Sequence, residues 1–265
     1  MRSWQTRRLG YSRRQRTPTL MPSDARTILD LLAQVDHERA ARAADAGLAT
    51  SVAAVKEYQQ RRFRRTYADL LANPRYAAAA LFFLDELYGP RDFGERDAQF
   101  ARVVPALVRL FPQEIVETVE ALARLHALSE RFDTAMGRHA PAATLDARSY
   151  RLAWQHTGDA PGREQQVELL LNVGNRLERL TRKPLLRRTL HLMRGPARAA
   201  GLATLQAFLE TGFDTFAAMK GAQHFLQTVA ERERALAAAL FAASDEAVAG
   251  ATLESSVESP LGQLP

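Results

Sequence analysis

The apolar residues of this chain recur at three- and four-residue spacing from about residue 23 to residue 243, and this helical period limits the possible folds more than any other feature. No run of alternating β-branched residues is long enough to demand a strand, because valine and isoleucine are sparse beside alanine and leucine. We therefore expect an all-α protein of about nine to ten helices in an orthogonal or mixed bundle, with no sheet. At 265 residues and 46% hydrophobic content, the chain is long enough to bury its own core.

Capping and helix-breaking residues predict where these helices begin and end. Thr50 or Ser51 has a side chain suited to cap one helix. Another helix is expected to run unbroken from Pro74 to Tyr88, between a proline at its first turn and a glycine at its end. Farther along, helices over residues 184–194 and 196–210 are expected to meet at the glycine between them.

These helices predict one helical domain over residues 23–243, with a candidate seam in the loop near 138–144. The segment after it, residues 244–265, is rich in Ser, Glu and Pro and is expected to be a disordered tail. We find no internal repeat of fixed period in the chain.

The net charge of +6 is concentrated at the amino terminus, where residues 1–20 contain six arginines and no acid. The rest of the chain has 30 basic and 30 acidic residues. The positive charge is therefore weak evidence for nucleic acid, and we regard a nucleic-acid partner as disfavoured. We expect residues 1–22 to be a disordered basic leader. It fits an arm for an anionic polymer, a transit peptide, or a segment upstream of a true start at Met21.

Several kinds of chemistry have no support in the sequence. The chain has no cysteine, and its longest apolar runs are nine residues, so we expect a soluble, cytoplasmic protein without disulfides or a membrane span. Phosphate-binding glycine loops and the nucleophile-elbow motif do not occur. None of the six histidines follows an acid by three residues, which disfavours a metal site. No cofactor is predicted, although a haem held through His191 alone stays open.

The segment from Phe82 to Asp97, FFLDELYGPRDFGERD, contains four aromatic and seven charged residues around one Gly-Pro corner. Capping explains Gly89, and core packing explains the phenylalanines. Charges in such apolar surroundings must be paired, so the corner is either a lock of paired charges or a ligand pocket. The candidate ligand-binding residues are Asp85, Glu86, Tyr88, Arg91, Arg96 and Asp97.

Two further polar groups could form binding sites. Asn172, Asn175 and Arg176 lie on one face of a predicted helix, where the amides could contact a ligand or a buried carbonyl, and they form a secondary candidate site. The four arginines around Phe63 in residues 61–65 are expected to spread over an exposed arc, with a phosphate-binding patch as the alternative.

At the Phe82–Asp97 corner, and again over residues 205–226 (LQAFLETGFDTFAAMKGAQHFL), the chain resembles a family of uncharacterised proteobacterial all-helical proteins. The shared pattern is FFLxxLYGPxDFxxRD. The resemblance implies a helical fold and a bacterial origin, and it carries no activity, substrate or cofactor.

Three hypotheses for the function follow. The first is a non-catalytic module that binds a small ligand or a protein through the Phe82–Asp97 corner. The second is a helical enzyme with an acid/base pair among Asp85, Glu86, Tyr88 and Asp97. The third is a binder of nucleic acid or of an anionic surface through the leader and the arginine-rich helix faces. The sequence does not identify the ligand, the partner or the oligomeric state.

Overall fold

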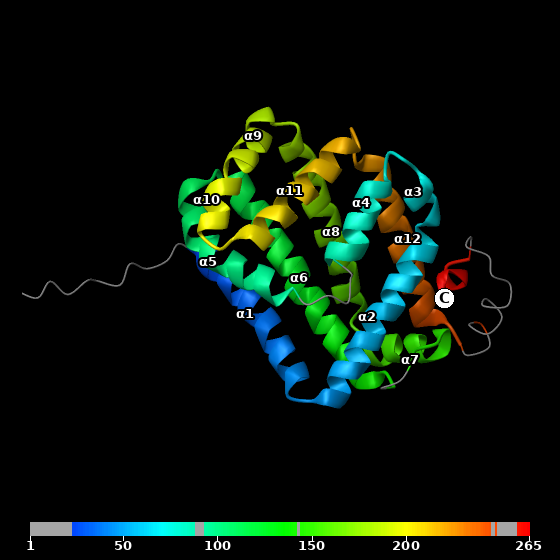
Figure 1. Cartoon of the computed structure of the whole chain (residues 1–265). Helices are drawn as coiled ribbons and strands as arrows, with labels where there is room; N and C mark the ends of the chain where they lie inside the picture. The colour runs from blue at the N-terminus through cyan, green and yellow to red at the C-terminus, as the bar shows by residue number, and fades with distance from the viewer. Residues whose placement is uncertain (1–22, 88–92, 142–143, 245–246, 248–258) are drawn as a thin grey trace, which may run out of the picture.

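The computed structural model (Figure 1) describes residues 23–87, 93–141, 144–244, 247 and 259–265, and these residues form helices and no strand. The all-α prediction is therefore confirmed. In chain order the elements are α1 (Ser23–Ala43), α2 (Ala46–Thr66), α3 (Ala68–Ala72), α4 (Ala77–Phe82), the π-helix η1 (Phe83–Leu87), α5 (Gly94–Leu110), α6 (Gln113–His139), α7 (Ala147–Thr157), α8 (Ala160–Thr181), α9 (Pro184–Leu192), α10 (Arg194–Ala199), α11 (Ala203–Ala218), α12 (Gln223–Ala242) and the 3₁₀ helix η2 (Leu261–Gln263).

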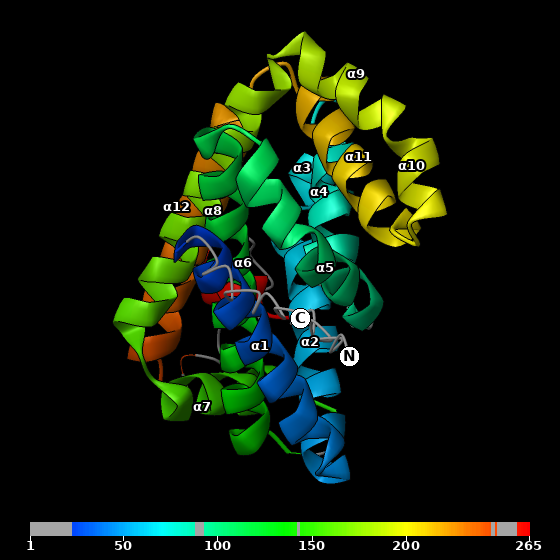
Figure 2. The same cartoon turned by 90° about the vertical axis from the view of Figure 1, so that its left-hand side faces the viewer.

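Helix α6 is the longest of the described helices and runs through the middle of the molecule, where α1, α2, α7 and α8 pack against it (Figure 1). Helix α8 packs in turn against α12, and α11 crosses α4, α5 and α8 (Figure 2). Glycines allow two of these close approaches, because a Cβ at Gly137 would overlap Val52 and one at Gly174 would overlap Leu226. Gly174 thus allows α12 to approach α8 closely.

The candidate seam near 138–144 does not divide the core. Tyr58 of α2 stacks on Tyr150 of α7, with the ring centroids 4.5 Å apart, so helices from both sides of that loop share one apolar cluster. Part of the predicted disordered tail belongs to the same cluster. Leu264 is fully buried, and Gln263 Oε1 accepts a hydrogen bond from Thr66 Oγ1 at 3.1 Å. The predicted leader, residues 1–22, lies outside the described residues.

The predicted start of α2, the end of α9 and the start of α10 were wrong. Helix α2 begins earlier than expected, because Asp45 caps it by accepting a hydrogen bond from the Leu48 backbone N–H at 3.1 Å, and Thr50 and Ser51 lie inside the helix. Helix α9 ends at Leu192, and α10 continues through the glycine at which a break was expected.

The expected unbroken helix from Pro74 to Tyr88 begins later than predicted and changes its type at Phe83. Pro74 lies in a turn, α4 begins only at Ala77, and the chain changes to the π-helix η1 at Phe83. The turn is held from a distance, because Arg75 donates hydrogen bonds to the carbonyls of Met219 (2.6 Å) and Gly221 (3.2 Å). Local spacing could not reveal this contact.

No helix in the described part of the chain combines the length and the apolar character needed to cross a membrane.

Candidate ligand-binding site

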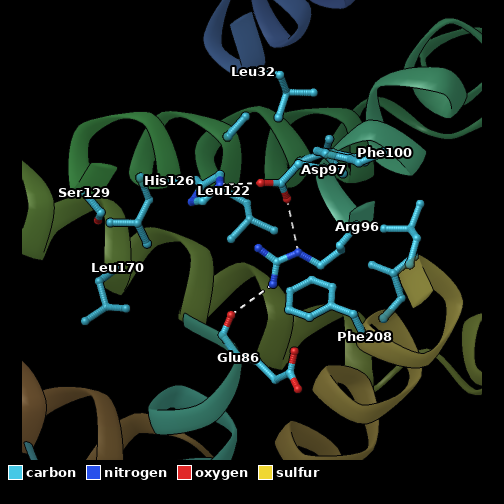
Figure 3. Close-up of a pocket in the computed structure, with 15 residues that line it drawn as sticks. Leu32, Glu86, Arg96, Asp97, Phe100, Leu122, His126, Ser129, Leu170 and Phe208 are labelled. Atoms are coloured by element: carbon cyan, nitrogen blue, oxygen red, sulfur yellow. Dashed lines mark hydrogen bonds and ion pairs between the residues drawn. The ribbon is translucent and has the colours of Figure 1, made fainter. Parts of the chain in front are cut away.

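A cavity of about 80 Å³ lies between α6 and the helices α1, α5, α8 and α11, beside η1 (Figure 3). Its walls are mainly apolar, with Phe100, Leu122, Leu170 and Phe208 among the lining residues. Five polar residues also line it, and they are Glu86, Arg96, Asp97, His126 and Ser129. We call this space the Asp97 cavity.

Asp97 accepts hydrogen bonds from three charged or ionisable side chains, one each on α1, α5 and α6. Its Oδ2 accepts hydrogen bonds from Arg39 Nη2 (2.6 Å) and His126 Nε2 (2.7 Å), and its Oδ1 accepts one from Arg96 Nε (3.2 Å). Figure 3 shows the His126 and Arg96 side chains converging on this carboxylate from α6 and α5. The side chain of Asp97 is buried, so its charge depends on these partners.

These partners keep Asp97 ionised. Burial by itself raises the pKa of Asp97, but the hydrogen bond and charge of His126, the charge of Arg96 and the hydrogen bond from Arg39 outweigh burial and hold the pKa well below its usual range. Because a carboxylate only accepts, His126 carries a proton on Nε2. Its second nitrogen, Nδ1, has no hydrogen bond to any described residue and is an acceptor when the ring is neutral.

Arg96 is held in place by aromatic rings and by the π-helix. Its guanidinium carbon lies 4.2 Å from the ring centroid of Phe93 and 4.5 Å from that of Phe208. Its Nη1 donates to the Glu86 carbonyl at 3.0 Å, which ties η1 to α5. These contacts fix the guanidinium at the cavity wall, where its remaining N–H groups can donate to a ligand.

A second, polar cavity of about 50 Å³ adjoins the first, since Ser129 lines both. Gln166 Nε2 donates to Ser129 Oγ at 2.8 Å. Arg163 lies between the rings of Phe132 and Trp154, 3.8 Å from each centroid, and also lines this second cavity. A buried charged side chain of α8 therefore lies against α6 beyond the Asp97 cavity.

The predicted corner residues separate in the structure. Glu86, Arg96 and Asp97 line the cavity, whereas Asp85 is partly buried and does not. Tyr88 and Arg91 lie outside the described residues, as does Asp92. Phe93 occupies the N-cap position of α5 without a side-chain hydrogen bond.

The secondary candidates lie away from both cavities. Asn172 and Asn175 are exposed on α8, so neither satisfies a buried carbonyl. Arg176 donates to Asn172 Oδ1 and to Glu117 Oε2, at 2.8 Å in each case, which makes this group a surface network. His191, on α9, is partly exposed and has its Nε2 3.9 Å from Asp214 Oδ2.

The expectation of four exposed arginines in residues 61–65 was wrong at Arg62. This side chain is buried, and its Nη1 and Nη2 donate to the two carboxylate oxygens of Glu233 at 2.5 and 3.1 Å. Tyr67 also donates to Glu233, at 2.6 Å. The ion pair with Glu233 of α12 holds Arg62 inward, so these arginines do not form one continuous basic patch.

The sequence motifs did not indicate His126 or Arg39, although α6 carried a signal. Val119, Leu122, His126, Glu130 and Asp133 follow one another at three- and four-residue spacing, so they share one face of the helix. The face begins apolar and continues with ionisable residues, which indicates charges directed into the core. Arg39 gave no such signal, because its partner is 58 residues away.

The model of a family described as a domain of unknown function (DUF8198) matches residues 38–247. No curated protein and no solved structure matches the chain. The matched range includes the described residues that line the Asp97 cavity except Leu32, which precedes it. The resemblance to a family of unknown function is confirmed at this level, and the proteobacterial origin stays a prediction.

Proposed function

The chain belongs to DUF8198, a domain of unknown function, and we propose that it binds a small, mainly apolar molecule in the Asp97 cavity, with Arg96 and His126 contacting a polar group of that molecule. The observation that carries the proposal is an apolar cavity with a prearranged group of ionised and hydrogen-bonding side chains in its wall. Such a combination is typical of small-molecule sites.

The arrangement of donors indicates which polar group would fit. Asp97 already accepts hydrogen bonds from three side chains, so a ligand would meet the remaining N–H groups of Arg96 and the Nδ1 of His126. A carboxylate or carbonyl group suits the guanidinium, and it accepts from Nδ1 of His126 when both ring nitrogens carry a proton. The volume of about 80 Å³ is roughly half that of an engineered cavity that admits benzene, at roughly 150 Å³. Short-chain carboxylic acids match both conditions.

The proposal is tested by closing the cavity. Leu209 borders both the cavity and solvent, with 39% of its surface exposed, so Leu209→Trp adds bulk at the edge of the cavity and leaves the core intact. Butyrate and 1-butanol share an apolar chain and differ in the carboxylate, and ligand-observed NMR detects weak binding of either. We expect wild-type protein to bind butyrate more tightly than butanol, and Leu209→Trp to weaken butyrate binding at least tenfold.

Leu81→Trp is the matched control, because Leu81 is similarly exposed (48%) and does not line the cavity. It should bind butyrate as the wild type does. Equal binding to both variants, or no binding of either probe to the wild-type protein, would contradict the proposal.

A helical enzyme is the second candidate function, and the Asp97–His126 pair favours it. A carboxylate that holds the proton on Nε2 leaves Nδ1 able to take a proton from a bound substrate, as a general base does. In the variant His126→Gln, the amide can still donate to Asp97 but cannot act as a base. If the protein is an enzyme, wild-type protein should consume a component of a host metabolite extract, as followed by mass spectrometry, and the variant should lose at least a hundredfold in rate while still binding butyrate. Equal rates for both proteins would exclude this role of His126.

A further inference from the structure

Helices α9 and α10 form the outer edge of the molecule on the far side of α11 from the Asp97 cavity, and Figure 2 shows one following the other along that edge. No residue of α9 is buried. Leu185 and Leu192 are 72% and 78% exposed, and Met193, directly after the helix, is 46% exposed. The two leucines are seven residues apart and therefore lie on the same side of the helix. This outward stripe has no partner among the described residues.

The segment that forms this edge carries charge of one sign, although four of its six cations pair with acids of other segments. From Thr181 to Leu209 the chain contains no acidic residue, and its basic residues are Arg182, Lys183, Arg187, Arg188, Arg194 and Arg198. Without this run, the chain beyond residue 20 has 24 basic and 30 acidic residues. An acid-free run of this length on the surface therefore distinguishes the α9–α10 edge from the rest of the molecule.

Some of these cations hold the edge in place. Arg187 pairs with Asp214 at 2.8 Å and Arg194 with Glu210 at 2.6 Å, both on α11. Gln206 on the same helix donates to the Leu190 carbonyl at 2.6 Å. These contacts bind the inner sides of α9 and α10 to α11 and leave the outer stripe uncovered.

The outer cations have no such role. Arg188 and Arg198 are exposed, and neither forms an ion pair with any described residue. Arg188 lies three residues after Leu185 and four before Leu192, so a positive charge stands within the apolar stripe. Exposed leucines with arginines beside them are typical of helices that lie in a membrane interface, where the apolar side chains reach the acyl chains and the cations remain at the phosphates.

We propose that the α9–α10 edge, residues 184–199, docks on a membrane surface that contains anionic lipid. Leu185, Leu192 and Met193 enter the interface, and Arg188 and Arg198 contact lipid phosphates. Charge complementarity selects an anionic surface, and the exposed leucines select lipid over nucleic acid, whose phosphates offer nothing for apolar side chains to contact. The proposal is independent of the ligand in the Asp97 cavity.

The test measures co-sedimentation of the full chain with phosphatidylcholine vesicles, with and without about one third phosphatidylglycerol, at low and high salt. We expect binding to the anionic vesicles only, weakened by salt. The double variant Leu185→Gln/Leu192→Gln should bind at least tenfold more weakly. The double variant Arg188→Gln/Arg198→Gln should lose about 25-fold, since each arginine near an anionic surface strengthens binding about fivefold.

Two controls separate this edge from general effects of charge and exposure. One control changes exposed leucines elsewhere, in the double variant Leu81→Gln/Leu110→Gln. The other changes exposed arginines on α2, in the double variant Arg61→Gln/Arg64→Gln. Both variants should bind as the wild type does. A chain without residues 1–20 should keep the leucine dependence. The proposal is overturned if the leucine variant binds like wild type, if deletion of residues 1–20 abolishes binding, or if the protein binds single-stranded DNA and not the vesicles.

Discussion

Replacing Glu130 with alanine should lower the free energy of unfolding by roughly 3–5 kcal/mol, the usual cost of removing one partner from a buried ion pair. Glu130 is buried on α6, where its Oε2 accepts a hydrogen bond from Arg42 at 2.5 Å and its Oε1 accepts one from Lys56 at 2.6 Å. Those two cations come from α1 and α2 and are partly buried, so the variant leaves both without their shared carboxylate. Denaturant unfolding measures the change.

Glu120→Ala is the matched control, because Glu120 lies on the same helix and pairs with Arg124, whose side chain is half-exposed. Exposed pairs four residues apart contribute only about 0.3–0.5 kcal/mol. If the two variants lose similar stability, the buried position of Glu130 has no special importance and the prediction is wrong.

The same carboxylate predicts a dependence of stability on pH. Burial alone would raise the pKa of Glu130, but the charge and hydrogen bond of Lys56, together with the charge of Arg42, hold the pKa at about 2, below the ordinary 4.5. The stabilisation, about 3 kcal/mol, is therefore complete above pH 4.5 and is lost as the pH falls toward 2. Burial raises the pKa of the neighbouring Asp133, which acts in the opposite sense. The charge of Glu130 also helps to raise the pKa of Asp133, so the comparison of Glu130→Gln with wild type measures the effect of Glu130 on this pair of carboxyl groups. The variant should show a shallower fall in Tm below pH 4.5.

Asp97→Ala should cost a similar roughly 3–5 kcal/mol, since it leaves Arg39, Arg96 and His126 without the acceptor on which they converge. Asp36→Ala is the control. Asp36 is exposed and lies 3.6 Å from the same Arg39, so its removal should cost less than about 1 kcal/mol. Thermal or denaturant unfolding of both variants decides the matter, and a folded Asp97→Ala protein of wild-type stability would contradict the role assigned to this carboxylate.

This role changes how the corner hypothesis must be tested. The sequence left open whether the Phe82–Asp97 corner is a lock of paired charges or a ligand pocket, and Asp97 takes part in both. Its carboxylate holds three donors together, and the same residue lines the cavity. Loss of ligand binding in Asp97→Ala would therefore report on folding, whereas Leu209→Trp reports on the cavity.

Much of the helical architecture could be predicted, and the errors have a common cause. Helices were recognised because apolar spacing and backbone propensity depend on residues a few positions apart. Their ends were misplaced where another side chain decides the boundary. Asp45 does so a few residues before the predicted start of α2, and Arg75 does so through the carbonyl of Met219, far along the chain.

The candidate site also combines features that the sequence indicated with contacts that depend on how the helices pack. By itself, the sequence identified the all-α class, the corner, and the need of its charges for partners, because a charge among apolar neighbours is costly wherever it lies. Only the tertiary structure decided which charges meet. Asp97 accepts from Arg39 and His126, and Arg62 pairs with Glu233, 171 residues away. Ion pairs and cavities depend on distances between helices, and those distances are determined by how α6 and its neighbours pack rather than by spacing along the chain.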